Sequence, residues 1–151
     1  MREKAILNYS WRRFFYFFFL NLQASRFVPS SLRVIMVKLG GVKVKKNVFL
    51  GSGISFDTLR PDLITIGEGC CITSGVKIIT HFLEPDKDTM YYDKVEIGSK
   101  VFIGMNSLIV NSVKIGDNSV IGAGSVVLKD IGEKEIWAGN PARFIRKRNV
   151  V

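Results

Sequence analysis

The sequence contains one histidine and two cysteines in 151 residues, and these low counts exclude several kinds of site. Cys70 and Cys71 are adjacent, so on a strand their side chains would point to opposite faces and would be poorly placed to bridge each other. No disulfide framework is indicated, which fits a reducing compartment, and we predict a cytoplasmic protein. The sequence holds no metal-ligand constellation, no P-loop and no dinucleotide-binding glycine motif, so we predict no metal site.

Acidic residues are almost missing from the first third of the chain. Residues 1–49 hold ten of the 22 lysines and arginines, with Glu3 as the single acidic residue, so this third carries the whole net charge of +9. A basic chain can indicate nucleic-acid binding, but no recognition motif accompanies the charge, and we predict no nucleic-acid partner. Because the basic residues are interleaved with very apolar ones, an anionic membrane surface is the better-supported partner.

A period of six residues organises the chain between positions 97 and 131. An aliphatic residue returns at every sixth position, and a second small or branched residue follows each one by four. The first set is Ile97, Ile103, Ile109, Ile115, Ile121 and Val127; the second is Val101, Ser107, Val113, Ser119, Ser125 and Ile131. This period fits neither a helix nor a simple alternating strand, and it indicates a solenoid in which each hexapeptide forms a short strand and a turn.

The repeat resembles that of the hexapeptide-repeat acyltransferases, in particular the branch of sugar and polysaccharide O-acetyltransferases. The resemblance covers residues 42–148 and implies an all-β fold, a left-handed parallel β-helix. We expect a helical segment over 1–41 before this domain and an expelled loop over 80–94 within it. The family also implies a homotrimer with active sites between protomers.

The N-terminal segment contains an aromatic run, Phe14 to Leu20, that is too short to span a bilayer. We expect a helix over 11–22 that either binds peripherally to the inner membrane surface or caps the solenoid or packs between subunits. A secretory signal is a third interpretation, which the aromatic composition disfavours. A second helix is predicted over 32–39, with Ser30 or Ser31 as N-cap and Gly40-Gly41 as its end.

His81, the single histidine, opens the expelled loop. Direct transfer of an acyl group from a thioester to a hydroxyl requires a base, and an imidazole suits that task near neutral pH. The family's sugar acetyltransferases carry their catalytic histidine at the start of such a loop, so the resemblance implies that His81 is the general base. Asp57 either orients this imidazole, binds an acceptor hydroxyl, or caps backbone amides in a turn. Glu84, in the same expelled loop, is a weaker candidate for a role in the site.

The resemblance further implies acetyl-CoA as the co-substrate. Gly104, Gly122, Met105 and Ala123 would line a groove for its pantetheine arm, and Lys129 and Arg143 would meet its phosphates. Asn140-Pro141 belongs to the same C-terminal signature and also fits a turn that ends the solenoid. The zinc carbonic anhydrases that share this fold need three histidines and are therefore excluded.

Together these features predict an acetyl-CoA-dependent O-acetyltransferase that modifies a sugar hydroxyl in surface polysaccharide biosynthesis. Its acceptor would be a sugar or a lipid-linked or nucleotide-linked sugar. An N-acetyltransferase of an amino sugar, a serine O-acetyltransferase and a catalytically inactive membrane-associated scaffold remain as alternatives.

Overall fold

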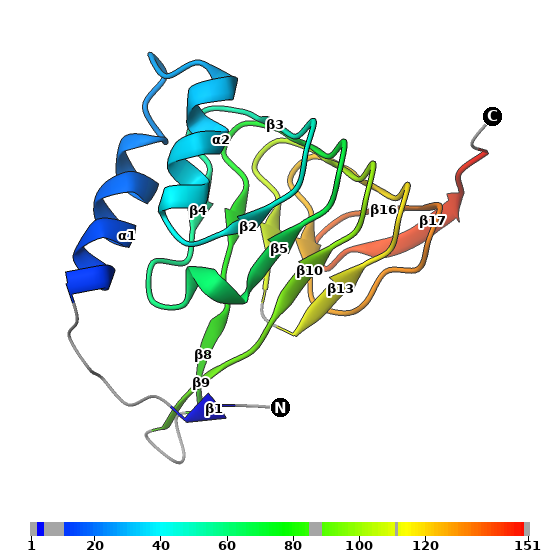
Figure 1. The fold of residues 1–151 in the computed structure, drawn as a ribbon. Helices are drawn as coiled ribbons and strands as arrows, with labels where there is room; N and C mark the ends of the chain where they lie inside the picture. Colours follow the sequence, from blue (N-terminus) through cyan, green and yellow to red (C-terminus); the bar gives the residue numbers. More distant parts are fainter. Residues whose placement is uncertain (1–2, 5–10, 85–88, 111, 150–151) are drawn as a thin grey trace.

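The computed structural model describes residues 3–4, 11–84, 89–110 and 112–149. Parallel strands wind into a prism with three walls (Figure 1). The first wall contains β2 (Lys43–Val44), β5 (Ile64–Ile66), β10 (Val95–Ile97) and β13 (Val113–Ile115). The second wall contains β3 (Phe49–Leu50), β6 (Cys71–Ile72), β11 (Phe102–Ile103), β14 (Val120–Ile121), β16 (Glu135–Ala138) and the antiparallel β17 (Arg143–Lys147). The third wall contains β4 (Ser55–Phe56), β7 (Lys77–Ile78), β12 (Leu108–Ile109) and β15 (Val126–Val127).

The strand register confirms the predicted hexapeptide period. Val95 pairs with Val113, Phe102 with Val120 and Leu108 with Val126, an offset of 18 residues on every wall. Three hexapeptides therefore make one coil, and each coil lays one strand on each wall. Equivalent residues of successive coils consequently lie side by side.

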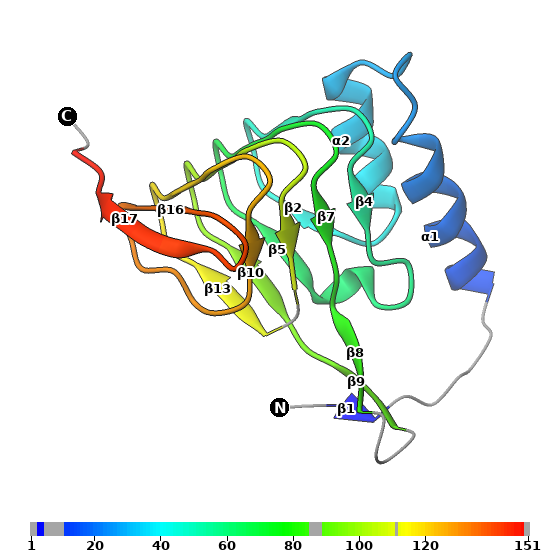
Figure 2. The same ribbon diagram turned by 180° about the vertical axis from the view of Figure 1, so that it is seen from behind.

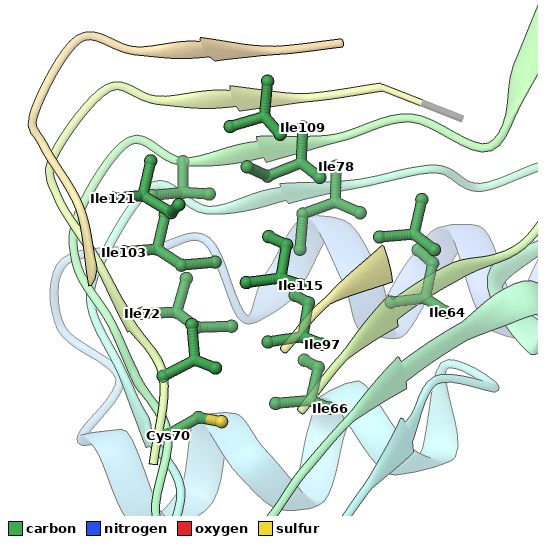
Figure 3. Close-up of a cluster of buried hydrophobic side chains, with 14 of the residues drawn as sticks. Ile64, Ile66, Cys70, Ile72, Ile78, Ile97, Ile103, Ile109, Ile115 and Ile121 are labelled. Atoms are coloured by element: carbon green, nitrogen blue, oxygen red, sulfur yellow. The ribbon is translucent and has the colours of Figure 1, made fainter. Parts of the chain in front are cut away.

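The predicted aliphatic positions form the core of the prism. Ile97 and Val127 are at most 3% exposed, and the four isoleucines between them are fully buried. Their side chains stack in columns along the walls (Figure 3). The columns are Ile66, Ile97 and Ile115; Ile72, Ile103 and Ile121; and Ile78 and Ile109. Cys70 is also buried, and its Sγ donates to the Gly98 carbonyl oxygen at 2.9 Å.

Buried serines occupy several of the second positions and are satisfied by the backbone. The hydroxyl of Ser125 donates to the carbonyl oxygen of Gly122 at 2.6 Å, and that of Ser119 to Gly132 at 2.7 Å. Buried polar groups are tolerated when they are hydrogen-bonded in this way, so a small serine can occupy a buried position between two walls.

Gly104 is required by the close approach of successive coils. A Cβ atom at this position would lie 2.4 Å from the backbone nitrogen of Ala123 on the next coil. The turns themselves are made by other residues, such as Asn106 and Asn118, which adopt left-handed backbone conformations. Asn residues therefore serve these turns, while the missing side chain of Gly104 allows two coils to pack closely.

Two helices cover the N-terminal end of the prism, and β16 and β17 lie at the opposite end (Figure 1). The first helix, α1 (Trp11–Leu22), has the predicted bounds. The second, α2 (Ser30–Leu39), starts two residues earlier than predicted, and the expected serine N-cap is wrong. Pro29 is the N-cap, and the Ser30 hydroxyl instead accepts a hydrogen bond from the Leu50 amide. α1 thus caps the end of the solenoid together with α2, but its aromatic side chains Trp11, Phe14 and Phe15 are all exposed and take no part in the cap.

Arg33 on α2 joins the helices to the first coil. Its side chain is buried, and its guanidinium donates to the carbonyl oxygens of Gln23 (2.8 Å), Leu50 (2.7 Å), Ser25 (3.0 Å) and Val28 (2.5 Å). One planar group thus satisfies four acceptors, three from the segment between α1 and α2 and one from β3.

We expect Arg33→Ala to lower the free energy of unfolding by about 2 kcal/mol, because it leaves buried carbonyl oxygens without donors. Denaturant unfolding at a fixed protein concentration measures this loss. Lys38→Ala, an exposed cation on the same helix, serves as the control and should cost little. Equal losses in the two variants would contradict the structural role of Arg33.

The expelled loop forms a β-hairpin that leaves the third wall after β7 (Figure 2). Its strands are β8 (His81–Glu84) and β9 (Thr89–Tyr92), and β1 (Glu3–Lys4) pairs antiparallel with β9. The sequence did not predict the hairpin or its third strand. Among the helices of the described chain, none has the length and apolar composition needed to cross a membrane.

Candidate active site

Asp57 and His81 meet at the edge of the third wall where β4 and β7 end. Figure 2 shows these two strands side by side. Ser55 pairs with Lys77 and Phe56 with Ile78, so the residues that follow these strands lie on neighbouring coils of one chain. The turn after β4 and the start of the expelled loop therefore converge on a single site within one protomer.

The Asp57 carboxylate receives hydrogen bonds from four donors. Oδ1 accepts from the Leu59 amide at 2.9 Å, and Oδ2 accepts from both the amide and the hydroxyl of Thr80 at 2.8 Å. Oδ2 also lies 2.6 Å from Nδ1 of His81. The carboxylate thus caps a turn and orients the imidazole at once, so two of the predicted roles coincide in one side chain.

The protonation of this pair follows from the donors around Asp57. Burial alone would raise the pKa of Asp57, but the hydrogen bonds from Leu59, Thr80 and His81 outweigh it and hold the pKa below its ordinary value. The ionised carboxylate can only accept, so Nδ1 of His81 carries a proton. In the neutral imidazole Nε2 is then the free acceptor nitrogen, which is the state a general base requires.

His81 lines an open cleft of about 430 Å³. One side is built from β4, the turn after it and the end of β7, including Ser55, Thr58 and Ile79. Phe17 and Asn21 of α1 complete the cleft. The His81 side chain is about one-third exposed, whereas the Asp57 side chain is 1% exposed, so the imidazole is accessible while its partner is not.

Tyr92 contacts the imidazole of His81, and Arg60 in turn contacts Tyr92. The buried Tyr92 pairs with His81 across the hairpin, and their rings meet edge to face with centroids 6.4 Å apart. The guanidinium carbon of Arg60 lies 5.9 Å from the Tyr92 ring centroid. The hairpin therefore carries His81 on one strand and, through Tyr92 on the other strand, also holds the imidazole ring in place.

Several of the residues predicted for coenzyme A gather at the other edge of the third wall. Gly104 and Met105 precede β12, and Gly122 and Ala123 precede β15 on the next coil. The Gly124 amide donates to the Met105 carbonyl oxygen at 2.7 Å. Met105 and Ala123 are exposed, Gly122 is half-buried and Gly104 is buried. These four residues form the predicted cofactor corner, which is open to solvent at Met105 and Ala123.

The C-terminal residues predicted for coenzyme A divide between two places. Asn140-Pro141, joined by a cis peptide bond, forms the turn between β16 and β17. Arg143 follows it, pairs with Ala138 in the antiparallel register of these strands, and has an exposed side chain. Lys129 lies apart from the corner, with its ammonium 5.2 Å from the Trp137 ring centroid. The side chain of Glu84 lies outside the described residues.

Within one chain the imidazole and the predicted cofactor corner do not meet. The strands of the third wall are parallel, so they share an entry edge and an exit edge. Met105 and Ala123 lie at the entry edge, and His81 lies at the exit edge. The width of the wall separates them, and a single protomer does not combine the two halves.

Covalent catalysis by a thiol is disfavoured. Burial raises the pKa of both the Cys70 and the Cys71 thiols, which keeps them protonated and weakly nucleophilic. Across 11–84, 89–110 and 112–149, no three His, Cys, Asp or Glu side chains converge in the way that a metal site requires.

Sequence reasoning missed three residues of the site. Thr80, the residue before His81, donates twice to Asp57. Phe17 and Asn21 enter the cleft because α1 packs beside β4, and no local pattern signals that contact.

Comparison with known proteins agrees with the repeat. Residues 94–129 match the family described as Bacterial transferase hexapeptide (six repeats). Protein CapG of Staphylococcus aureus is 38% identical over 138 residues, which covers 85% of this chain and 76% of that protein. A galactoside O-acetyltransferase of Escherichia coli (strain K12) is 41% identical over 92 residues, covering 57% of this chain and 45% of the relative. The chain spans about half the length of the galactoside O-acetyltransferases that it matches.

Solved structures extend the match to the whole fold. A maltose O-acetyltransferase from Clostridium difficile 630 has a TM-score of 0.73 at 25% identity, covering 98% of this chain and 94% of that one. A galactoside acetyltransferase in complex with coenzyme A has a TM-score of 0.70 at 26% identity, covering 91% and 81%. The left-handed parallel β-helix is therefore confirmed, and the chain belongs to the bacterial hexapeptide-repeat transferase family.

Proposed function

We propose that this protein is an acetyl-CoA-dependent O-acetyltransferase that modifies a sugar hydroxyl, with His81 as the general base. The observation that carries the proposal is the imidazole held by a buried carboxylate at 2.6 Å on the wall of an open cleft. The names of the relatives, a galactoside and a maltose O-acetyltransferase, support the reaction and the sugar class of acceptor. The solved relative bound to coenzyme A supports the donor.

The chemistry follows from the tautomer. Nε2 of His81 accepts the proton of the acceptor hydroxyl as its oxygen attacks the thioester carbonyl carbon. The carbon–sulfur bond then breaks, and the imidazolium returns the proton to the leaving thiolate, so protons and electrons balance. Asp57 stabilises the imidazolium that forms between these steps and keeps the ring in place.

The acetyl donor would be held at the corner of Gly104, Met105, Gly122 and Ala123, with Asn140-Pro141 beside it. Ala123 is small and exposed there, which would let a narrow pantetheine arm approach the backbone, and Arg143 supplies an exposed cation for phosphate. Lys129 would have to leave the Trp137 ring to contribute.

We propose a homotrimer in which this corner of one protomer faces His81 of another. Two observations support a site shared between protomers. The first is the separation of His81 from the predicted cofactor corner within one chain, and the second is an apolar row on the outer face of the second wall. In register across that wall lie Phe49, Cys71, Phe102, Val120 and Ile136. The equivalent row on the first wall is polar, with Lys43, Thr65, Glu96 and Lys114.

The cellular setting that we propose is the cytoplasm, where unbridged Cys70 and Cys71 are stable and acetyl-CoA is made. The acceptor that we propose is a sugar unit of a surface polysaccharide, free or linked to a lipid or nucleotide carrier. A cleft of about 430 Å³ is in the range that holds such a small ligand.

A panel of sugars incubated with acetyl-CoA tests the function. We expect release of free coenzyme A that depends on a sugar hydroxyl, and an O-acetyl ester detected by mass spectrometry. Acetylation restricted to amino sugars would replace the proposal with N-acetyl transfer. Binding of coenzyme A without turnover on any acceptor would indicate an inactive scaffold.

A further inference from the structure

α1 carries two apolar faces, and the fold uses only one of them. Leu20 is 3% exposed and packs into the end of the prism beside α2. The other face bears large apolar side chains at the spacing i, i+3, i+4, i+7 and i+11, which places them in one stripe. This outer stripe consists of Trp11 (84% exposed), Phe14 (63%), Phe15 (54%), Phe18 (50%) and Leu22 (42%).

The exposure continues beyond the helix. Phe27, in the segment between α1 and α2, is 96% exposed. Single exposed apolar residues need no explanation, but a contiguous aromatic stripe of this size marks a surface that binds something. Phe14 contacts Phe15 and Phe18 contacts Phe19 edge to face, so these rings lie next to one another on the surface of α1.

The charge around the outer stripe selects the kind of partner. Residues 1–49 carry the full net charge of +9, and the remainder of the chain is neutral. Arg12 and Arg13 follow Trp11 in the sequence of α1, and Arg26 and Lys38 are exposed on the segments that follow. Aromatic side chains backed by cations fit an interface of acyl chains and anionic headgroups.

We propose that the outer stripe of α1 docks on the surface of an anionic lipid bilayer, with the helix axis lying in the interface. The aromatic rings enter the boundary between headgroups and acyl chains, and the surrounding cations contact the lipid phosphates. The positive charge of the N-terminal third complements such a surface.

Docking in this way also constrains the acceptor, an extension that rests on the proposed function. Phe17 and Asn21 of the same helix line the cleft that holds His81. A bilayer against α1 therefore lies next to the cleft, and this arrangement suits a sugar carried on a membrane lipid. A soluble sugar would reach the same imidazole without help from the membrane.

Co-sedimentation of the full chain with vesicles tests docking without any turnover. We expect pelleting with vesicles of phosphatidylcholine and phosphatidylglycerol, and at least tenfold weaker binding to phosphatidylcholine alone or in high salt. Phe14→Ser/Phe18→Ser should weaken binding to the anionic vesicles about tenfold or more. Leu83→Ser/Leu128→Ser, which alters leucines of similar exposure away from the helices, is the matched control and should bind as the parent does.

Each outcome bears on docking separately from catalysis. Equal pelleting of the parent and Phe14→Ser/Phe18→Ser, or no pelleting of the parent, overturns the proposal. A change in sedimentation coefficient of the variant, with vesicle binding unaltered, also overturns it and assigns the outer stripe to contact between copies of the chain. Acetylation of a soluble sugar should persist in Phe14→Ser/Phe18→Ser, so loss of docking and failure of the proposed function are distinguishable.

Discussion

His81→Ala is expected to lower kcat for acetyl transfer by about 10³-fold, equivalent to about 4 kcal/mol in the activation barrier. The variant loses the group that accepts the hydroxyl proton, and no second imidazole exists in the sequence. Affinity for coenzyme A should stay within about twofold, because His81 is proposed to act on the acceptor hydroxyl and is not among the residues proposed to hold coenzyme A. Steady-state kinetics and calorimetric titration with coenzyme A measure the two quantities.

Leu83→Ala provides the control for His81→Ala, since Leu83 belongs to the same strand and is 54% exposed. It should retain kcat. Retention of full turnover by His81→Ala would remove this residue from the chemistry and leave only the fold assignment.

Asp57→Asn is expected to reduce kcat by about 10²-fold and the free energy of unfolding by about 2 kcal/mol. The carboxylate accepts from four donors, whereas an amide has one acceptor oxygen. Either orientation of the amide leaves the Leu59 or the Thr80 backbone N–H facing another donor. With the NH2 group toward His81, Nδ1 becomes the acceptor and Nε2 carries the proton, which blocks its use as a base.

The stability part of this prediction depends on pH. Because the folded-state pKa of Asp57 is lowered, its ionisation stabilises the fold at any pH above the unfolded value of about 3.9. The stability difference between the parent and Asp57→Asn should be constant near neutral pH and shrink as pH falls through the folded-state pKa. A difference that grows on acidification would contradict the assigned ionisation state.

A purely structural role for Asp57 would give a different kinetic pattern. If the residue only caps a turn, its loss would lower Tm while the surviving folded enzyme kept its kcat. We expect instead that the relative kcat of Asp57→Asn falls well below the fraction of the variant that is folded. Thr80→Val, which removes one of the four donors and keeps the backbone amide, should show an intermediate loss.

The architecture was predictable because the coil repeats one local rule. An isoleucine every sixth residue, as at Ile103 and Ile109, specifies which side chain faces inward on every wall. The proximity of Asp57 and His81 follows from the same rule. Both residues follow a strand of the third wall on adjacent coils, so the register brings them together.

Other features were beyond sequence reasoning because they depend on contacts between distant segments. The position of α1 against β4 puts Phe17 in the cleft, and the N-terminal strand β1 joins the expelled hairpin by tertiary pairing alone. The start of α2 was misplaced because Ser30 satisfies the Leu50 amide on β3 instead of capping its own helix. Lys129 meets the Trp137 ring, a contact that the hexapeptide pattern does not encode.

The central claim is that a buried carboxylate presents the Nε2 atom of one imidazole, unprotonated, to an open cleft. Nitrogen-15 NMR tests it directly, since a protein with one histidine gives one unambiguous set of imidazole signals. We predict the neutral tautomer protonated on Nδ1, with the bare Nε2 signal shifting when the acceptor sugar binds. A neutral ring protonated on Nε2, unaffected by acceptor, would contradict the account.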